Sequence, residues 1–262
     1  SHPEIVDGSF VHHNMHMAEP EVMDLILKEN PDYVIHAAGI SDVDYSIREP
    51  YRTLKKNAYG IFHAFEACRN LPNLKKFIYV STDEVYGECE ELKSETDILA
   101  PRNPYSASKA IGSLLHIAYE NTYPNLKGKI AETRFCNVFG PRQDTRKILP
   151  IIKRALETGE PVPVFDVGGS YREYIYVVNI PPAVELILEK GTGAYNVTNN
   201  DGYTVANLIK KVEEITGKKI PTTVSHRPGI DMKYQMKSDR IRQLGWKPLH
   251  SFAEGIAQYL NA

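Results

Sequence analysis

Short apolar runs alternate with stretches of helical periodicity along the first two thirds of the chain. Runs without two-residue alternation, such as "YVIHAA" and "KKFIYVS", are typical of strands buried on both faces. Because strands separated by helices pair in parallel, the pattern predicts an α/β fold with a doubly wound, Rossmann-like parallel sheet. The predicted strands are 9–12, 33–37, 76–81, 130–135 and 174–177, and the predicted helices are 21–29, 50–70 and 105–121.

The pattern changes after Gly140, where four prolines surround a single helical stretch. The run at 174–177 and a helix at 183–189 are expected to return to the sheet. We expect a smaller, discontinuous C-terminal lobe, separated by a cleft from the larger domain. The larger domain would comprise 1–140 plus about 171–192, and the smaller lobe 141–170 plus about 193–262. Further helices are predicted at 148–160, 204–217, 237–246 and 251–260.

Composition narrows the class of protein without identifying it. The 262 residues are 42% hydrophobic and 24% charged, with a formal net charge of -2. A balance so close to neutral argues against a general nucleic-acid or membrane surface. No apolar run approaches the roughly 20 residues that span a bilayer. Three widely separated cysteines indicate a reducing compartment and no disulfide framework, so we expect a cytoplasmic protein.

Two short motifs could carry acid–base chemistry. In "YSASK", Tyr105 and Lys109 lie four residues apart and share one face of the predicted helix. An ammonium beside the phenol would lower the tyrosine pKa and make it a usable base. In "STDEVYG", Asp83 and Glu84 follow a predicted strand. Each motif also has a plainer interpretation: an exposed pair on a helix for the first, and a solvated turn for the second.

A cluster of histidines in "HHNMHM", residues 12–17, suggests a metal site. No cysteine or carboxylate cluster at ligand spacing accompanies it, whereas protein metal sites usually need several well-placed ligands. We therefore predict no metal.

Several further stretches occur in one order along the chain, and together they carry a resemblance. They are "HAAG" (36–39), Asn57 in "KNAYG", "STDEVYG", "PYSASKA", "TRFCNVFGPRQ", "REYIYV" (172–177) and "HRPGIDMKY". Over essentially its whole length the chain resembles the extended short-chain dehydrogenase/reductase family, the NAD-dependent epimerases and dehydratases of nucleotide sugars. The Asp-Glu pair at 83–84 makes it most similar to the dTDP-glucose 4,6-dehydratases.

This resemblance implies a reaction with NAD as cofactor. Tyr105 would take the proton of the sugar 4-hydroxyl, Thr82 would bond the same oxygen, and Lys109 would hold the nicotinamide ribose. Glu84 would then remove the C5 proton, while a protonated Asp83 would donate to the departing 6-hydroxyl. Adjacent carboxyls with separated pKa values suit these two roles. The alternatives are another nucleotide-sugar dehydratase, a 4-epimerase, or a non-catalytic sugar-nucleotide-binding relative.

The resemblance also assigns binding residues, with NAD in the larger domain and the nucleotide sugar in the smaller lobe. The implied cofactor-binding residues are Asn14, Met15, Ala37, Ala38, Gly39, Ser41, Lys56, Tyr105 and Lys109. The implied substrate-binding residues are Ser41, Thr82, Asn137, Lys147, Leu149, Pro163, Val164, Arg172 and Arg227. The two arginines suit a pyrophosphate, since guanidinium binds phosphate in a bidentate manner. The helices at 50–70 and 105–121, each with an apolar face, would form a homodimer.

The family's first strand, glycine-rich turn and helix hold the NAD pyrophosphate. No G-x-x-G-x-x-G occurs near the start of this sequence. We therefore expect an N-terminally truncated sheet that leaves the strand at 33–37 with an unpaired edge. Three explanations are open: a fragment, a unit supplied by another chain or replaced by dimerisation, or a natural relative that has lost NAD binding.

Overall fold

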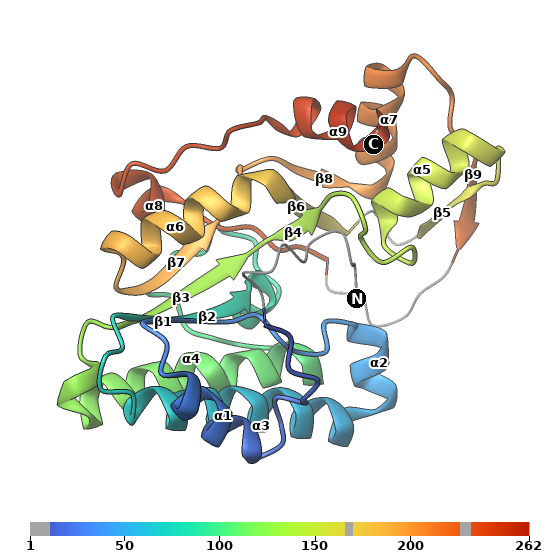
Figure 1. Cartoon of the computed structure of the whole chain (residues 1–262). Coiled ribbons are helices and arrows are strands. Elements are labelled where there is room, and N and C mark those ends of the chain that lie inside the picture. Colours follow the sequence, from blue (N-terminus) through green and yellow to red (C-terminus); the bar gives the residue numbers. More distant parts are fainter. Residues whose placement is uncertain (1–10, 166–169, 226–231, 262) are drawn as a thin grey trace.

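The main sheet has four parallel strands in the order β1-β2-β3-β7 (Figure 1). The computed structural model describes residues 11–165, 170–225 and 232–261. The predictions of strands at 33–37, 76–81 and 130–135 are confirmed, and β7 was not predicted. The bounds of the four strands are Tyr33–His36, Lys76–Thr82, Ile130–Phe135 and Gly193–Val197.

Helices cover both faces of this sheet. The side chains of β2 point to the two faces in turn, so each face packs against its own helices. Phe77 and Tyr79 pack in one apolar cluster with Phe65 of α3, and Ile78 packs in another with Ile187 of α6. Figure 1 shows α1, α3 and α4 together below the sheet, with α6 above it. The helices are α1 (Glu21–Glu29), α3 (Pro50–Arg69), α4 (Pro104–Thr122) and α6 (Ile180–Lys190), each near a predicted range.

A second group of elements forms the smaller lobe around its own core. Strand β6 pairs in parallel with β4 and antiparallel with β8, while β5 pairs in parallel with β9. These strands are β4 (Asn137–Phe139), β5 (Val162–Phe165), β6 (Tyr171–Tyr176), β8 (Gly202–Thr204) and β9 (Thr222–Ser225). The helices here confirm the predicted ones: α5 (Ile148–Thr158), α7 (Val205–Thr216) and α9 (Phe252–Asn261), with α8 (Asp239–Gln243) packed on β7.

Two strand predictions need correction. The run at 174–177 does not return to the main sheet: its first three residues belong to β6, which pairs with β4 and β8, and Val177 begins the 3-10 helix η4 (Val177–Asn179). The reason is that β7 already occupies the place beside β3. Of the strand predicted at 9–12, residues 9 and 10 lie outside the described residues, and Val11 and His12 are not in a strand. Strand β7 pairs in the main sheet, although its residues fall in the range assigned to the smaller lobe. The division into two domains stays a prediction.

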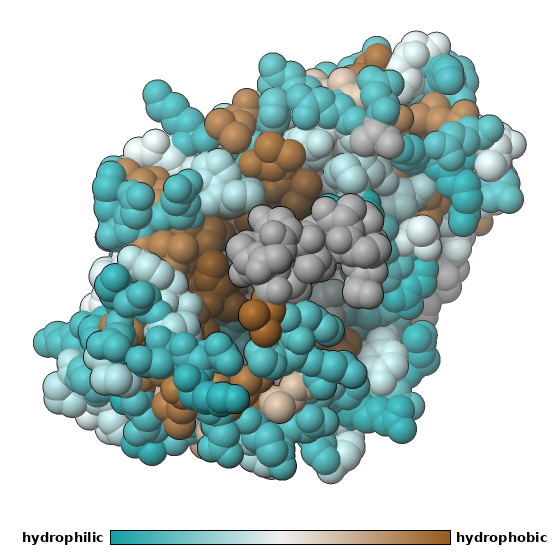
Figure 2. Space-filling model, in the orientation of Figure 1, coloured by the Kyte–Doolittle hydropathy of each residue, from teal (hydrophilic) through white to brown (hydrophobic). Residues whose placement is uncertain are grey.

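Within the described residues, β1 lies at an edge of the main sheet. Its Tyr33 and Ile35 are 49% and 47% exposed, although strand residues of this kind are usually covered. Figure 2 shows apolar surface in a hollow at this level of the molecule, beside the residues drawn in grey. Among the helices described, none is both long and apolar enough to cross a membrane.

Candidate active site

The "STDEVYG" motif forms a tight turn at the carboxyl end of β2. Thr82 ends the strand, and its hydroxyl accepts a hydrogen bond of 3.4 Å from the backbone N–H of Glu84. The 3-10 helix η2 (Asp83–Tyr86) follows, and Gly87 ends it with φ 69°. A Cβ on Gly87 would lie 2.2 Å from the carbonyl oxygen of Ala100, so glycine is required. The turn therefore places both carboxyls at the strand end, where parallel sheets bind ligands.

Asp83 and Glu84 occupy different environments, although they are adjacent. Asp83 is 3% exposed, and burial followed by the charge of Glu84 raises its pKa to about 7. One of its oxygens accepts from the Thr82 hydroxyl at 3.1 Å, while the other is buried without a hydrogen bond. Glu84 is partly exposed and accepts from the Asn103 amide at 3.0 Å. Asp83 is thus suited to hold a proton at neutral pH, and Glu84 faces the more open side.

Tyr105 lies in the first turn of α4, and capping fixes the start of that helix. Asn103 and Ser106 form a reciprocal capping box. The backbone N–H of Tyr105 donates to the hydroxyl of Ser46, on the short helix α2 (Val43–Arg48), at 3.2 Å. Burial, and then the charge of Glu84, raise the pKa of Tyr105, and a hydrogen bond with Thr82 acts against them. Thr82, Asp83, Glu84 and Tyr105 therefore lie close together, and their catalytic roles stay a prediction.

Lys109 does not act on Tyr105 as the spacing suggested. Its ammonium donates to the carbonyl of Val80 and lies 4.8 Å from the centre of the Tyr79 ring. Burial lowers the pKa of Lys109 to about 8, against the opposing charge of Glu132. The expected lowering of the Tyr105 pKa is thus wrong for this structure, because helical spacing fixes the shared face but not the side-chain direction.

Asn57 fastens the loop after β1 to α4, a role that the sequence did not reveal. Its side chain accepts from the N–H of Ile40 at 2.7 Å and donates to the carbonyl of Ile40 at 3.0 Å. It also donates to the hydroxyl of Ser108 at 2.8 Å, and Ser108 donates to the carbonyl of Tyr105 at 2.6 Å. Gly39 has φ 156°, and a Cβ there would lie 3.1 Å from the Asn57 oxygen. The loop and the tyrosine are therefore held as one unit.

Strand β6 contributes Arg172 to the surroundings of Asp83. The positive charge of Arg172 lowers the pKa of Asp83, opposite to the effect of burial. Its guanidinium lies 4.4 Å from the centre of the Tyr234 ring and donates to the carbonyl of Tyr171 at 2.8 Å. The neighbouring Glu173 is buried, which raises its pKa to about 8, and it accepts from the N–H of Met236 at 2.9 Å. A second buried carboxyl was not predicted from the sequence.

The remaining predicted site residues are more dispersed. The exposed ones are Asn14 and Met15 in the loop before α1, Ala37, Ala38, Gly39 and Ser41 after β1, Lys56 on α3, Asn137 on β4, and Lys147 before α5. Pro163 and Val164 of β5 are partly exposed. Leu149 is only 1% exposed within the core of the smaller lobe, so its side chain has no free surface for a ligand. Arg227 lies outside the described residues.

The described residues fit one end of NAD. Small, exposed residues at the carboxyl end of β1 leave room for a flat ring near Tyr105 and Lys109. Within 11–165, 170–225 and 232–261, however, no strand, glycine-rich turn and helix follow one another to hold a pyrophosphate. The same residues contain no group of three histidines, cysteines or carboxylates that could bind a metal ion.

Comparison with known proteins identifies relatives of this arrangement. Residues 1–259 match the family model described as GDP-mannose 4,6 dehydratase. The low-salt glycan biosynthesis protein Agl12 of Haloferax volcanii is 34% identical over 260 residues, which is 95% of this chain and 82% of that protein. The dTDP-glucose 4,6-dehydratase of Xanthomonas campestris is 31% identical, over 90% of this chain and 74% of that protein. A trifunctional UDP-glucose 4,6-dehydratase of Arabidopsis thaliana is 32% identical over 90% of this chain, which spans only 36% of that protein.

Solved structures agree with these relatives. DesIV, a dTDP-glucose 4,6-dehydratase from Streptomyces venezuelae solved with NAD, matches with a TM-score of 0.88 and 26% identity. That match covers 99% of this chain and 81% of DesIV. UDP-glucose 4-epimerase from Thermotoga maritima, solved with UDP-glucose, matches with a TM-score of 0.88 and 30% identity over 95% of this chain and 82% of its own. The chain therefore belongs to the GDP-mannose 4,6 dehydratase family, among the NAD-dependent epimerases and dehydratases of the short-chain dehydrogenase/reductases.

Proposed function

We propose that this chain is a nucleotide-sugar 4,6-dehydratase that uses NAD and acts on dTDP-glucose. The observation that carries the proposal is the pair of carboxyls at the end of β2. Asp83 is buried with a pKa raised to about 7, while its neighbour Glu84 faces the open side. An elimination of water needs a base for one proton and an acid for the departing hydroxyl. Asp83 and Glu84 supply both within one turn.

The other residues divide the reaction among themselves. Tyr105 accepts the proton of the 4-hydroxyl, and Thr82, hydrogen-bonded to Tyr105, orients the same oxygen. Glu84 removes the C5 proton, which a 4-keto group makes acidic, and Asp83 protonates the departing 6-hydroxyl. When bound, NAD would accept the hydride that leaves C4 and return it to C6, while C5 regains a proton from Glu84. Ala37, Ala38, Gly39 and Ser41 would line its nicotinamide end, with Asn14, Met15 and Lys56 farther along.

Base action by Tyr105 requires a rearrangement of Lys109. Burial and the charge of Glu84 raise the pKa of Tyr105, and an opposite charge beside the phenol would favour the phenolate. Lys109 is one helical turn away, with its ammonium on the carbonyl of Val80. We infer that Lys109 turns from Val80 toward Tyr105 in the catalytic state, where it also holds the cofactor ribose.

The nucleotide would lie against the smaller lobe. Arg172 and Arg227 would hold the pyrophosphate, since guanidinium pairs with phosphate oxygens in a bidentate manner. Asn137 and Ser41 would contact the phosphates and the sugar, and Lys147, Pro163 and Val164 would border the nucleoside. Leu149 is packed in the core, so it would support this region from beneath.

The test supplies purified protein with NAD and dTDP-glucose and follows the product by mass spectrometry and NMR. We expect a 4-keto-6-deoxy product that has lost one water. Glu84→Gln should abolish it, because the amide cannot accept the C5 proton. Glu88→Gln is the matched control, since Glu88 is near in sequence but pairs with Arg102. The proposal would be refuted if no product forms and calorimetry detects no binding of NAD.

A second candidate, a 4-epimerase, is favoured by the match to the Thermotoga maritima epimerase. The same incubation separates the two, because an epimerase returns a sugar with inverted C4 and no loss of water. Binding of the sugar nucleotide without NAD binding would instead indicate a non-catalytic relative.

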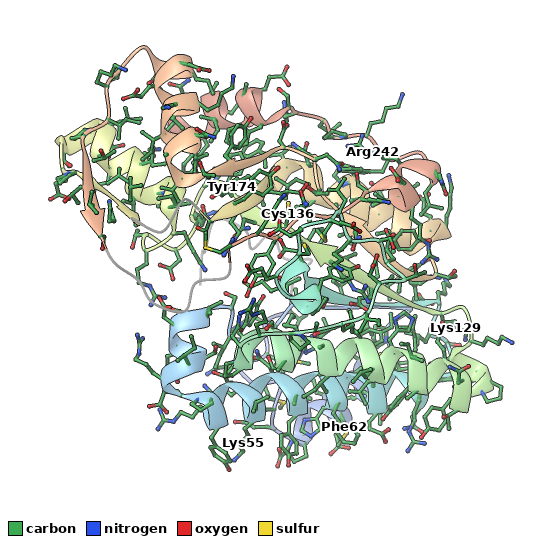
Figure 3. The ribbon with its side chains drawn as sticks, turned by 180° about the vertical axis from the view of Figure 1, so that it is seen from behind. Lys55, Phe62, Lys129, Cys136, Tyr174 and Arg242 are labelled. Carbon is green, nitrogen blue, oxygen red and sulfur yellow. The ribbon has the colours of Figure 1, made fainter. Side chains whose placement is uncertain are left out.

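We also infer a homodimer through the outer faces of α3 and α4. Exposed apolar side chains follow helical spacing along both, which is unusual for a solvated helix. They are Tyr51, Leu54, Tyr59 and Phe62 of α3 and Leu114 and Ile117 of α4. Figure 3 shows Lys55 and Phe62 projecting from α3 away from the sheet. Light scattering should give the mass of a dimer, and Phe62→Glu should convert it to a monomer. Leu249 is exposed away from these two helices, so Leu249→Glu should leave the dimer intact. A Phe62→Glu variant that is still dimeric would refute this interface.

A further inference from the structure

Two charged residues on the central strand β3 are buried inside the sheet. Glu132 is 1% and Arg134 is 4% exposed. The guanidinium Nε donates to Glu132 Oε1 at 2.7 Å, and Nη2 donates to Oε2 at 3.3 Å. Helix α4 satisfies the same carboxylate: Ser113 donates to it at 2.6 Å, and His116 lies 3.8 Å away. Because burying two charges is costly unless every partner is supplied, the arrangement needs an explanation beyond packing.

The other end of Arg134 points to the proposed acid–base segment. Its Nη1 donates to the hydroxyl of Tyr86 at 2.6 Å, and its guanidinium carbon lies 4.9 Å from the centre of the Tyr86 ring. Tyr86 is 2% exposed and is the last residue of η2, which begins with Asp83. The Tyr86 hydroxyl in turn donates to the side chain of Asn196 on β7 at 2.8 Å. One tyrosine hydroxyl is therefore held from two neighbouring strands.

These contacts fix η2 at both ends. At its start, Thr82 pairs with Phe135 in the register of β2 and β3. At its end, Tyr86 is held by Arg134 and Asn196, and the N–H of Ala100 donates to the carbonyl of Val85 at 2.9 Å. A turn of four residues with both ends held has little freedom to expose its first side chain. Asp83 and Tyr86, at the two ends of this short turn, are both buried.

We propose that Arg134, fixed by Glu132, is a positioning residue for the acid–base pair: through Tyr86 it keeps Asp83 buried and Glu84 turned toward Asn103. The proposal rests on the proposed dehydration for its effect on rate, but its structural part can be tested without activity. Loosening of η2 would admit water to Asp83, and the carboxyl would then ionise at lower pH.

The test removes a single hydroxyl, in Tyr86→Phe. The pKa of Asp83 is read from its labelled side-chain carboxyl carbon by NMR, with Asp83→Asn to assign the signal. The titratable groups that act on Asp83 are Glu84 on its own turn, Cys89 in the loop after η2, Arg172 and Glu173 on β6, Cys136 after β3 and Tyr105 on α4, and none of them changes. We expect the pKa to fall by at least one from about 7, toward the ordinary 3.8.

Kinetics give a second readout. If the pKa of Asp83 falls by one, about nine tenths of the Asp83 that is still protonated at alkaline pH loses its proton. We therefore expect the alkaline limb of the kcat/KM profile, which reports the free protein, to move to lower pH and kcat/KM at pH 8 to fall about tenfold. The KM for the sugar nucleotide should stay within about twofold, because the nucleotide contacts are untouched. A purely structural role would lower stability and leave the pH profile in place.

Two further variants complete the design. Tyr195→Phe is the matched control: Tyr195 is buried on β7, and its hydroxyl accepts from the N–H of Thr192 at 3.2 Å, away from η2. It should leave the Asp83 pKa unchanged. Arg134→Lys keeps the charge but lacks the fork that reaches Glu132 and Tyr86 together, so it should act like Tyr86→Phe. If Tyr86→Phe does not fold, Arg134→Lys decides.

The proposal is overturned if the Asp83 pKa does not change from the wild type in Tyr86→Phe or Arg134→Lys, whichever of the two folds. This holds whatever the activity of the variants. If the wild type makes no 4-keto product while the Asp83 pKa falls in the variants, the positioning role stands and only the proposed function is lost.

Discussion

Removal of Arg134 alone should destabilise the protein severely, because it leaves Glu132 as an unpaired charge inside the sheet. Burial by itself raises the pKa of Glu132, but hydrogen bonds and charges from His116 and Arg134 outweigh it and lower the pKa to about 2. Relative to the ordinary value of 4.5, this is worth about 3 kcal/mol for the carboxylate in the folded state. Breaking a buried pair by removal of one partner costs about 3–5 kcal/mol, so we expect Arg134→Met to lower the free energy of unfolding by about that amount at pH 7.

A double variant isolates the charge from the packing. Glu132→Leu/Arg134→Met replaces both charges by apolar side chains of similar size, a change that often costs little. Ser113 and Tyr86 each lose a hydrogen-bond partner, at about 1 kcal/mol apiece, and His116 loses the carboxylate 3.8 Å away. We expect the double variant to be more stable than Arg134→Met alone. Urea unfolding at pH 7 measures this through the fluorescence of Trp246, the only tryptophan, which is 3% exposed.

The pH dependence gives the decisive comparison. The folded pKa of Glu132 is depressed, so its stabilising contribution is present above pH 4.5 and is lost as the pH falls toward 2. In Arg134→Met the carboxyl has no guanidinium partner, so its protonation on acidification relieves the cost. The stability gap between wild type and Arg134→Met should therefore narrow between pH 5 and about 3. A gap that is constant with pH, or a double variant as unstable as the single one, would refute the reasoning.

Three smaller perturbations test other parts of the fold by urea unfolding. Gly87→Ala should lower the free energy of unfolding by well over the about 1–2 kcal/mol of left-handed backbone strain, because its Cβ would lie 2.2 Å from a carbonyl oxygen. The control is Gly128→Ala, with φ 74° and open space around it, which should cost only that strain. Equal costs for the two variants would contradict the steric argument. Gly112→Ala should destabilise despite better helix propensity, because its Cβ would lie 2.3 Å from the Tyr79 ring; a gain in stability would show that the ring yields. The folded pKa of His116 is raised because hydrogen bonds and charges from Glu120 and Glu132 outweigh burial, so its contribution is full below pH 6.5 and is lost as the pH rises through the folded pKa. The advantage of wild type over His116→Gln should thus be larger at pH 6 than at pH 9, and a reversed order would disprove the assignment.

The sequence predicted those parts of the fold that local pattern determines. Strands β1, β2 and β3 are apolar runs flanked by helices, and they lie where the pattern placed them. The partner of a strand is not a local property, which is why β6 was assigned to the main sheet and β7 was not predicted. The run "GAYNV" of β7 begins with glycine and has a buried polar residue at its fourth position, so its apolar signal is weak.

The site divides in the same way. The resemblance assigned Thr82 and Tyr105 to one site, and the structure brings them within hydrogen-bond reach, since the order of strand, turn and helix positions both. The direction of Lys109 depends on Tyr79 and Val80, which lie far from it in sequence. Glu132 was hidden within a predicted apolar strand. The charges at alternate positions of "IAETRF" were the one signal that could have revealed a buried pair on one face.

The positive charge of Arg172 affects when Asp83, the proposed acid, carries its proton. Burial, and then the charge of Glu84, raise the pKa of Asp83, whereas the positive charge of Arg172 lowers it. A pyrophosphate bound by Arg172 brings negative charge that offsets the guanidinium. The pKa of Asp83 should therefore rise when a nucleotide binds, so that the acid is protonated when the substrate is present.

This argument is testable without turnover, by NMR titration of the Asp83 carboxyl. Arg172→Met should raise the pKa of Asp83 above about 7 in the free protein, because the positive charge that lowers it is gone. Addition of dTDP should raise the pKa in the wild type and have a much smaller effect in Arg172→Met. Arg154→Met is the control, since Arg154 is exposed on α5 and pairs with Glu160. A pKa that falls or stays constant in Arg172→Met would show that Arg172 does not act on Asp83 in solution, and the loading of the acid by substrate would have no physical basis.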